Sequence, residues 1–392
     1  MPDSFQNALT LLAAIAWATP PEGPAAGDAP LVSRGIWVAD ADGKPTPPGS
    51  FTRGLQTSGL IFREGELWSI GDQRSQFPGQ IFRMDPRTAR LLEGPVKLEV
   101  PPETAGENPE FAAYRRIPNS DFEGFALHPL EPGSLYAITE DKIPWVAEIR
   151  LEKGPEGPAP ARAPDSHRAR IVQLTRIRFP ADAEPWRDDL NFRFEGCAIH
   201  DDGKTLFLAF ERAKDELPRL YRSSLDAARS GKEIELEKVV VAFGDVPPRK
   251  DKPEARLNLN DIAFFRHQGR PALLAVARDQ ERLLVVDLEK KAVTRYVDLD
   301  LLDPTGAAIE WASPEGVAVD APRGRVWIIT DPDSVGKSYR ARAESAPTGK
   351  FADYSPLLFE LELGTVLGAT GGAGQEGDRG ERQNKESRKG RK

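Results

Sequence analysis

A short pattern of strands recurs along most of the chain. Each copy begins with glycine or another small residue at the start of an apolar strand, a position that we call the threshold. The chain then continues through a turn into further short strands, as in EGFALHPLEPGSLYAITED and EGCAIHDDGKTLFLAFER. The thresholds at Gly59, Gly124, Gly196 and Gly316, with Ile262 in the equivalent place, are separated by 65, 72, 66 and 54 residues. Four-stranded units repeated at such a period are typical of a β-propeller.

The repeats predict an all-β fold with five four-stranded blades; six blades are the alternative, because the insertions between strands are long. The fifth copy lacks a fourth strand, whereas one orphan strand, LVSRGIWVAD at 31–40, precedes the first copy. We therefore predict that strand 31–40 completes the fifth blade and closes the ring, which removes an open sheet edge. The propeller would span 31–367, between a signal-like or disordered segment at 1–30 and a disordered basic tail at 368–392.

The N-terminal segment contains an apolar run from Ala8 to Ala18 that ends in a small-x-small sequence, although no Lys or Arg precedes it. The run has the length of a signal peptide and is too short to span a bilayer. A periplasmic or secreted location is therefore favoured over a cytoplasmic one. The alternatives are an appended helix or a misplaced start.

The charge of the chain bears on its partners. The net charge is −8, and the last 25 residues contribute +3, so the remainder carries about −11. An acidic body disfavours nucleic acid as a partner and favours cations or cation-bridged ligands. We expect a monomer whose partner is a small anionic or ester substrate, or a protein ligand. Cys197 is the only cysteine, which excludes an intrachain disulfide, and we expect it to be buried.

Carboxylates recur at two places in each copy, the start of the first strand and the end of the second. In a propeller these two places lie at the same mouth of the central channel. The acids predicted to hold a metal ion are Asp121, Glu123, Glu140, Glu195, Glu211, Asp261, Glu315 and Asp331. Because such a ring would repel itself, it must be neutralised, and a hard cation such as Ca²⁺ suits a flexible set of oxygen ligands.

Basic residues beside the second-strand acids offer another means of neutralisation, and arginine can also clamp anionic oxygens. The predicted substrate-binding residues are Asp72, Arg74, Lys142, Arg212, Arg278 and Asp279. Any one acid could instead be structural, by accepting N–H bonds from a neighbouring blade. The second-strand charges could likewise be ordinary ion pairs between blades.

The histidines argue against two other kinds of site. His128, His200 and His267 fall at the ends of first strands, near turns that lie at the opposite mouth, where we expect them to be solvated. A zinc site or a Ser-His hydrolase is therefore not expected among the acids.

The stretches DFEGFALHP…LYAITED, FEGCAIHDDGKTLFLAFER and SPEGVAVD…VWIITDPD resemble the esterase-like phytase propellers. The resemblance covers most of residues 50–365. It implies a calcium-dependent or calcium-stabilised propeller, with phosphoester or ester hydrolysis in some members. SdiA-regulated-type and gluconolactonase-type propellers also use Glu-Gly thresholds.

Glu123, Glu195 and Glu315 match the glutamates of the Glu-Gly pairs in that family. Glu140 and Glu211 match the acids at the ends of its second strands. The chain departs from the pattern in its first copy, with Ser-Gly at 58–59, and in its fourth copy, with Asn-Asp-Ile at 260–262. Propeller phytases also have six blades, whereas five are predicted here.

Two functions follow from these features. The first is a phytase-like or esterase-like hydrolase that depends on Ca²⁺ at the acidic mouth; its catalytic residues are not identified. The alternative is a non-catalytic propeller that binds a ligand or a protein and holds a structural cation. A sugar lactonase, which would need a base and a metal in the channel, is a third hypothesis.

Overall fold

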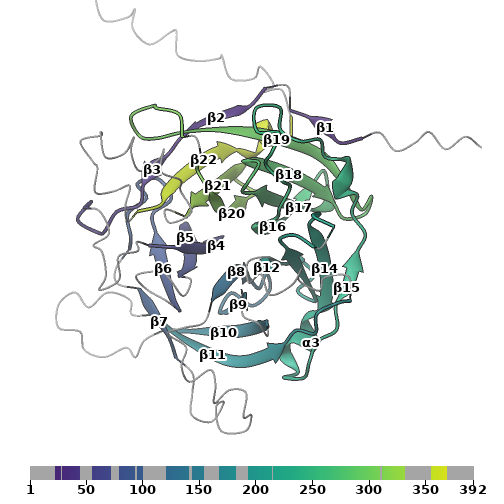
Figure 1. Ribbon diagram of the computed structural model, residues 1–392. Helices are drawn as coiled ribbons and strands as arrows, with labels where there is room; N and C mark the ends of the chain where they lie inside the picture. The colour runs from purple at the N-terminus through teal and green to yellow at the C-terminus, as the bar shows by residue number, and fades with distance from the viewer. Residues whose placement is uncertain are drawn as a thin grey trace, which may run out of the picture.

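The strands of the protein surround a central channel as five four-stranded blades, which confirms the predicted fold (Figure 1). The computed structural model describes residues 23–27, 29–44, 55–71, 79–92, 95–99, 121–140, 144–153, 167–181, 193–213, 215–309, 311–331 and 355–368. Among the described residues, no helix has the length and apolar character needed to cross a bilayer.

Neighbouring strands within each blade are antiparallel, and the first strand of each blade lies at the channel. Blades 1 and 2 contain β4 (Thr57–Arg63), β5 (Glu66–Gly71), β6 (Gln80–Met84), β7 (Val96–Glu99), β8 (Phe122–Leu127), β9 (Ser134–Thr139), β10 (Trp145–Lys153) and β11 (His167–Arg176). Blade 3 contains β12 (Phe194–Ile199), β13 (Thr205–Phe210), β14 (Arg219–Ser224) and β15 (Glu237–Val239). Blades 4 and 5 contain β16 (Asp261–His267), β17 (Arg270–Ala277), β18 (Arg282–Asp287), β19 (Ala292–Leu302), β20 (Pro314–Asp320), β21 (Arg325–Thr330), β22 (Leu357–Glu362) and β3 (Ile36–Trp37).

Helical structure in the described residues is confined to α3 (Leu225–Arg229), the 3₁₀ turn η2 (Phe243–Asp245) and α6 (Leu363–Val366). Helix α3 begins at Ser224, whose hydroxyl accepts the N–H of Ala227, so its first turn is capped.

The N-terminal strands close the ring in two steps. Strand β2 (Leu31–Arg34) pairs in parallel with β19 of blade 4, and β3 pairs antiparallel with β22 of blade 5. Gly35 lies between them and contacts Phe359 so closely that a Cβ would meet its ring at 2.8 Å. Strand 31–40 therefore completes the fifth blade as predicted, but its first half belongs to the edge of the fourth. Strand β1 (Ala25–Ala26) also pairs with β19, so pairing begins before residue 31.

The hydrophobic core is divided into five clusters among the described residues, and each cluster is built from two neighbouring blades. Between blades 1 and 2, for example, Ile61 and Trp68 pack with Phe125 and Leu135. Alternate side chains of a strand point to opposite faces of its sheet, so each blade contributes to two clusters. This explains why the apolar strands repeat: no single blade can bury both of its faces.

The threshold glycines lie where the inner strands approach one another most closely. A Cβ on Gly124 would lie 2.5 Å from the backbone nitrogen of Cys197, and a Cβ on Gly196 would lie 2.8 Å from the Cα of Asp261. Gly59 and Gly316 make similar contacts with the next blade around the ring. Glycine is therefore required here by the close packing of one inner strand against the next.

Substitution of Gly124 by alanine is expected to lower the free energy of unfolding by about 1–3 kcal/mol, since the added methyl group must push apart two closely packed inner strands, β8 and β12, of neighbouring blades. Gly364→Ala is a matched control, because a Cβ at that exposed position in α6 meets nothing within 4 Å. Urea unfolding followed by circular dichroism measures both. Equal midpoints for the two variants would contradict the proposed role of the threshold glycine.

Candidate functional site

The inner strands begin with a local irregularity that directs their acidic side chains. The pairing of β8 with β9 shifts register between Phe122 and Phe125, and the pairings of β12 and β20 shift at Glu195 and Glu315. Such bulges re-aim a side chain at the end of a strand. Each Glu-Gly pair therefore lies within a bulge. We call the end of the channel at which the inner strands begin the acidic mouth.

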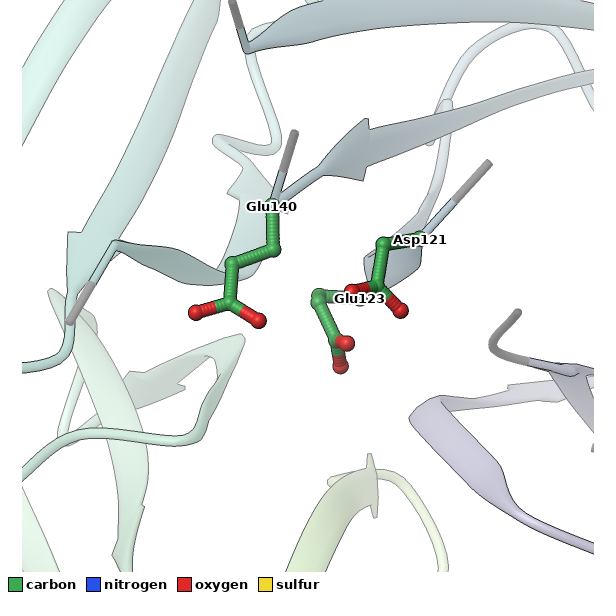
Figure 2. A group of neighbouring side chains, drawn as sticks. All are labelled: Asp121, Glu123 and Glu140. Atoms are coloured by element: carbon green, nitrogen blue, oxygen red, sulfur yellow. The ribbon is translucent and has the colours of Figure 1, made fainter. Parts of the chain in front are cut away.

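Three carboxylates of blade 2 converge at the acidic mouth, as Figure 2 shows. Asp121 and Glu123 come from the start of β8, and Glu140 directly follows β9. One oxygen from each side chain lies within 4.8 Å of the others, and the Glu140 N–H donates to the carbonyl of Asp121 at 2.8 Å, which fixes the two strand ends together. We call these three residues the blade-2 triad.

The spacing of the triad fits a cation. Oxygens on opposite sides of one Ca²⁺ are about 5 Å apart, since each Ca–O distance is about 2.4 Å. Two carboxylate oxygens at this mouth, Oε1 of Glu140 and Oε2 of Glu211, are buried and have no hydrogen-bond partner among the described residues. A buried carboxylate oxygen without a partner is costly, and a cation would satisfy it. These side chains therefore fit an ion such as Ca²⁺.

Blade 3 adds two buried acids beside the triad. Glu195 and Glu211 have exposed fractions of 6% and 1%. Burial and the charges of Glu140 and Glu123 raise the pKa of Glu195 well above its ordinary value, and burial likewise raises the pKa of Glu211. Burial, together with the negative charges of Asp121 and Glu211, raises the pKa of Glu140 to about 8.

Blade 5 contributes the remaining acids of the mouth. Glu315 and Asp331 are both buried, and the Asp331 N–H donates to the carbonyl of Ser313 at 3.0 Å. Burial is the main cause that raises the pKa of Glu315 to about 7, and the charge of Asp331 adds to it. Glu140 and Glu315 thus hold protons near neutral pH that isolated carboxylates would release.

Arg278 of blade 4 is the built-in counter-ion of the acidic mouth. Its Nη1 donates to Glu315 at 2.5 Å and its Nη2 donates to Glu211 at 2.9 Å, so it bridges blades 5 and 3. Although burial acts to lower it, these carboxylates raise the pKa of Arg278 above its ordinary value. Asp279 lies near two arginines: its Oδ1 is 3.7 Å from Nε of Arg278, and its Oδ2 is 3.9 Å from Nη1 of Arg212. The ion pairs predicted between blades are therefore present.

The strand register explains why an arginine occupies this place. Gly196 pairs with the residue two positions before Glu211, and Asp261 pairs with the residue two positions before Arg278. Arg278 therefore stands in blade 4 where other blades carry a second-strand acid. The same register places Asp261, and not Ile262, in the position of the threshold glycines, which corrects the sequence alignment by one residue.

The structure places Asp261 apart from the triad, inside the channel. Its Oδ2 accepts the N–H groups of Leu60 at 3.1 Å and Val317 at 2.9 Å, and its Oδ1 accepts the N–H of Ile262 at 2.9 Å. Burial raises the pKa of this fully buried carboxyl, and the three backbone N–H groups oppose that shift. Asp261 thus joins blades 1, 4 and 5 by hydrogen bonds.

Three predicted substrate-binding residues, Asp72, Arg74 and Lys142, lie outside the described residues. Two polar residues of the mouth were not predicted. Arg193 is buried and donates from Nη1 to the carbonyl of Glu140, and the Asn258 amide donates to Glu211 at 3.0 Å. A signal for Asn258 is the alternation of polar and apolar residues in LNLN at 257–260; Arg193 stands just before an inner strand.

The expectation of solvated histidines is wrong for His128. Its exposed fraction is 3%, and Nδ1 accepts the N–H groups of Leu130 and Glu131 at 3.2 Å and 2.9 Å. Burial lowers its pKa. The buried ring of His128 therefore holds the turn after β8 by hydrogen bonds to its backbone. The other predicted burial is confirmed, since Cys197 is fully buried.

Comparison with known proteins adds little beyond the fold. No protein-family model matches the chain, and no curated protein is significantly similar to it. Among solved structures it is similar to the glutaminyl cyclase of Myxococcus xanthus, with 12% identity over 86% of this chain and 97% of that one and a TM-score of 0.40. It is also similar to the PQQ-bound aldose sugar dehydrogenase of Streptomyces coelicolor, with 16% identity over 85% and 99% and a TM-score of 0.37.

A third similar structure is the GH74 enzyme of Niastella koreensis, with 11% identity over 82% of this chain and 37% of that one and a TM-score of 0.37. Sequence identities and TM-scores this low support no inference about activity. The assignment of a propeller rests on the strand pairing itself.

Proposed function

We propose that the acidic mouth binds Ca²⁺ through the blade-2 triad, and that the bound ion supports hydrolysis of a small phosphoester or ester. The observation that carries this proposal is the convergence of Asp121, Glu123 and Glu140 within 4.8 Å, beside buried carboxylate oxygens that have no partner among the described residues. The resemblance to the esterase-like phytases points to the same chemistry. An exported protein would meet calcium at concentrations that loosely built sites require.

Ca²⁺ would supply a Lewis acid that polarises a phosphoryl or carbonyl oxygen. The chain itself supplies a group for proton transfer beside the triad: burial and the neighbouring carboxylates raise the pKa of Glu195, so that it holds a proton more tightly than an exposed carboxyl does. In hydrolysis, the oxygen of water would bond to phosphorus or carbon as the bond to the leaving alcohol breaks. A carboxylate of the mouth would accept the proton of water, and the departing oxygen would take up a proton.

Hydrolysis is tested by release of inorganic phosphate or p-nitrophenol from p-nitrophenyl phosphate, inositol phosphates and p-nitrophenyl acetate. We expect release in Ca²⁺ to exceed release in EDTA by at least tenfold, because loss of a residue that only supports a metal ligand already lowers activity by about 10–100-fold, and loss of the ion should cost no less. Glu123→Gln is expected to abolish that difference. Glu235→Gln is the control, since Glu235 is exposed and pairs only with Arg178 among the described residues.

A binding propeller without catalysis is the second candidate function. It is favoured by Arg278, whose guanidinium already bonds two carboxylates and so has less capacity to clamp a substrate anion. Under this alternative Ca²⁺ would bind at the triad and stabilise the ring. Calcium binding in the absence of turnover on every substrate above would favour it over hydrolysis.

A further inference from the structure

The channel ends in a second cavity on the side opposite the acidic mouth. All five inner strands line this cavity, near the turns that lead to the second strands, and its volume is about 190 Å³. Apolar side chains form its wall, among them Phe62, Leu127, Ile199, Phe264 and Val319. We call this cavity the far pocket. None of its lining residues belongs to the triad or to the acids around it.

The far pocket is closed toward the acidic mouth. Asp261 lies on that side and ties Leu60 and Val317, which are on different blades, to its carboxylate. The threshold glycines pack there against the neighbouring inner strands. A ligand in the far pocket would therefore have the backbone of the inner strands between it and the acidic mouth. Because each wall strand is paired within its blade, the pocket exists before any ligand binds.

The lining contains one charged residue, Asp201, and its charge is already paired. Arg266 donates from Nη2 to Asp201 at 2.9 Å. The pocket therefore offers apolar surface without an unpaired charge. An enclosed apolar cavity of about 150 Å³ binds benzene; the far pocket has similar room for a ring, with polar as well as apolar surface around it, and small-molecule sites are likewise concave.

From this geometry we propose that the far pocket binds a small uncharged molecule through one aromatic ring or compact aliphatic group. The volume matches one or two rings and is too small for a helix or strand of a partner protein. Burial of the ring against five strands would provide the affinity, because apolar surface is removed from water. Calcium is not required, since the triad lies on the other side of Asp261.

The test uses indole, toluene and cyclohexanol as probes, with binding followed by ligand-observed NMR on the full-length protein in EDTA. We expect saturable binding of at least one probe to wild type. Leu127→Lys places a charge in the wall at a partly exposed position and is expected to weaken binding at least tenfold; Ala263→Phe is a second variant that fills space instead. Leu130→Lys is the matched control, because Leu130 is 66% exposed and lies outside the lining.

Two results would overturn the proposal. One is the absence of saturable binding of any probe to wild type, which would mean that the pocket holds water only. The other is equal binding by wild type, Leu127→Lys and Ala263→Phe, which would place the probes elsewhere. Retention of probe binding by Glu123→Gln is the expected sign that the far pocket acts separately from the acidic mouth.

Discussion

Replacement of Asp261 by alanine is expected to lower the free energy of unfolding by about 3–5 kcal/mol, since each buried donor left without an acceptor costs about 1–3 kcal/mol. The carboxylate accepts N–H groups from three blades, two of them across the channel. Without it those donors stay buried and unsatisfied at the place where the inner strands meet. Chemical denaturation in urea, followed by tryptophan fluorescence, measures the change.

Two further variants test whether the loss of stability comes from the Asp261 carboxylate itself. Asp261→Asn keeps one oxygen acceptor but turns an amide N–H toward a backbone N–H, so its destabilisation should be intermediate. Asp42→Ala is the control, because the Asp42 side chain is 74% exposed and pairs only with Lys44 among the described residues. Asp261→Ala with the unfolding midpoint of wild type would contradict the role assigned to Asp261.

Without calcium, the protein is expected to lose stability as the pH rises from about 5 to about 8. The pKa of Glu140 is raised to about 8 and that of Glu315 to about 7, so over this range the folded protein holds protons that the unfolded chain has released. Its free energy of unfolding then falls with rising pH by several kcal/mol, since each unit by which the folded pKa exceeds the unfolded one is worth about 1.4 kcal/mol. Ca²⁺ binds the ionised carboxylates and should restore about 2.7 kcal/mol at 100 times its dissociation constant.

Thermal unfolding in EDTA and in Ca²⁺ at several pH values tests this, and the stabilisation by Ca²⁺ should grow with pH. Glu140→Gln isolates the contribution of Glu140, which matters because His128 acts in the opposite direction: its lowered pKa makes the fold lose stability as the pH falls below about 6.5. A Ca²⁺ effect of equal size at pH 5.5 and pH 8.5 would show that these carboxyls are not its ligands.

The blades could be predicted from the sequence because each blade is built from strands that are close together in the chain, so that the same strand pattern recurs in every copy. The thresholds at Gly124 and Gly196 each precede an apolar strand, and the missing fourth strand of the last copy required a partner from elsewhere in the chain. That partner, 31–40, divides between two blades, which the sequence does not reveal because the close contact of Gly35 with Phe359 joins residues far apart in the chain.

The candidate site was harder to predict, because its contacts run between blades. The sequence places Asp121, Glu123 and Glu140 at one mouth, since all three stand at the ends of paired strands of one blade. The alignment of the fourth copy is ambiguous by one residue, and a shift of one residue reverses the direction of a side chain. The positions of Asp261 and Arg278 therefore became clear only from the strand register.

Calorimetric titration of the metal-free protein with Ca²⁺ at pH 8 tests most directly the claim that the acidic mouth is a cation site. We expect saturable binding of one ion at the triad, weakened at least tenfold by Glu123→Gln and unchanged by Glu235→Gln. No detectable binding to wild type, or equal binding by wild type and Glu123→Gln, would contradict the account.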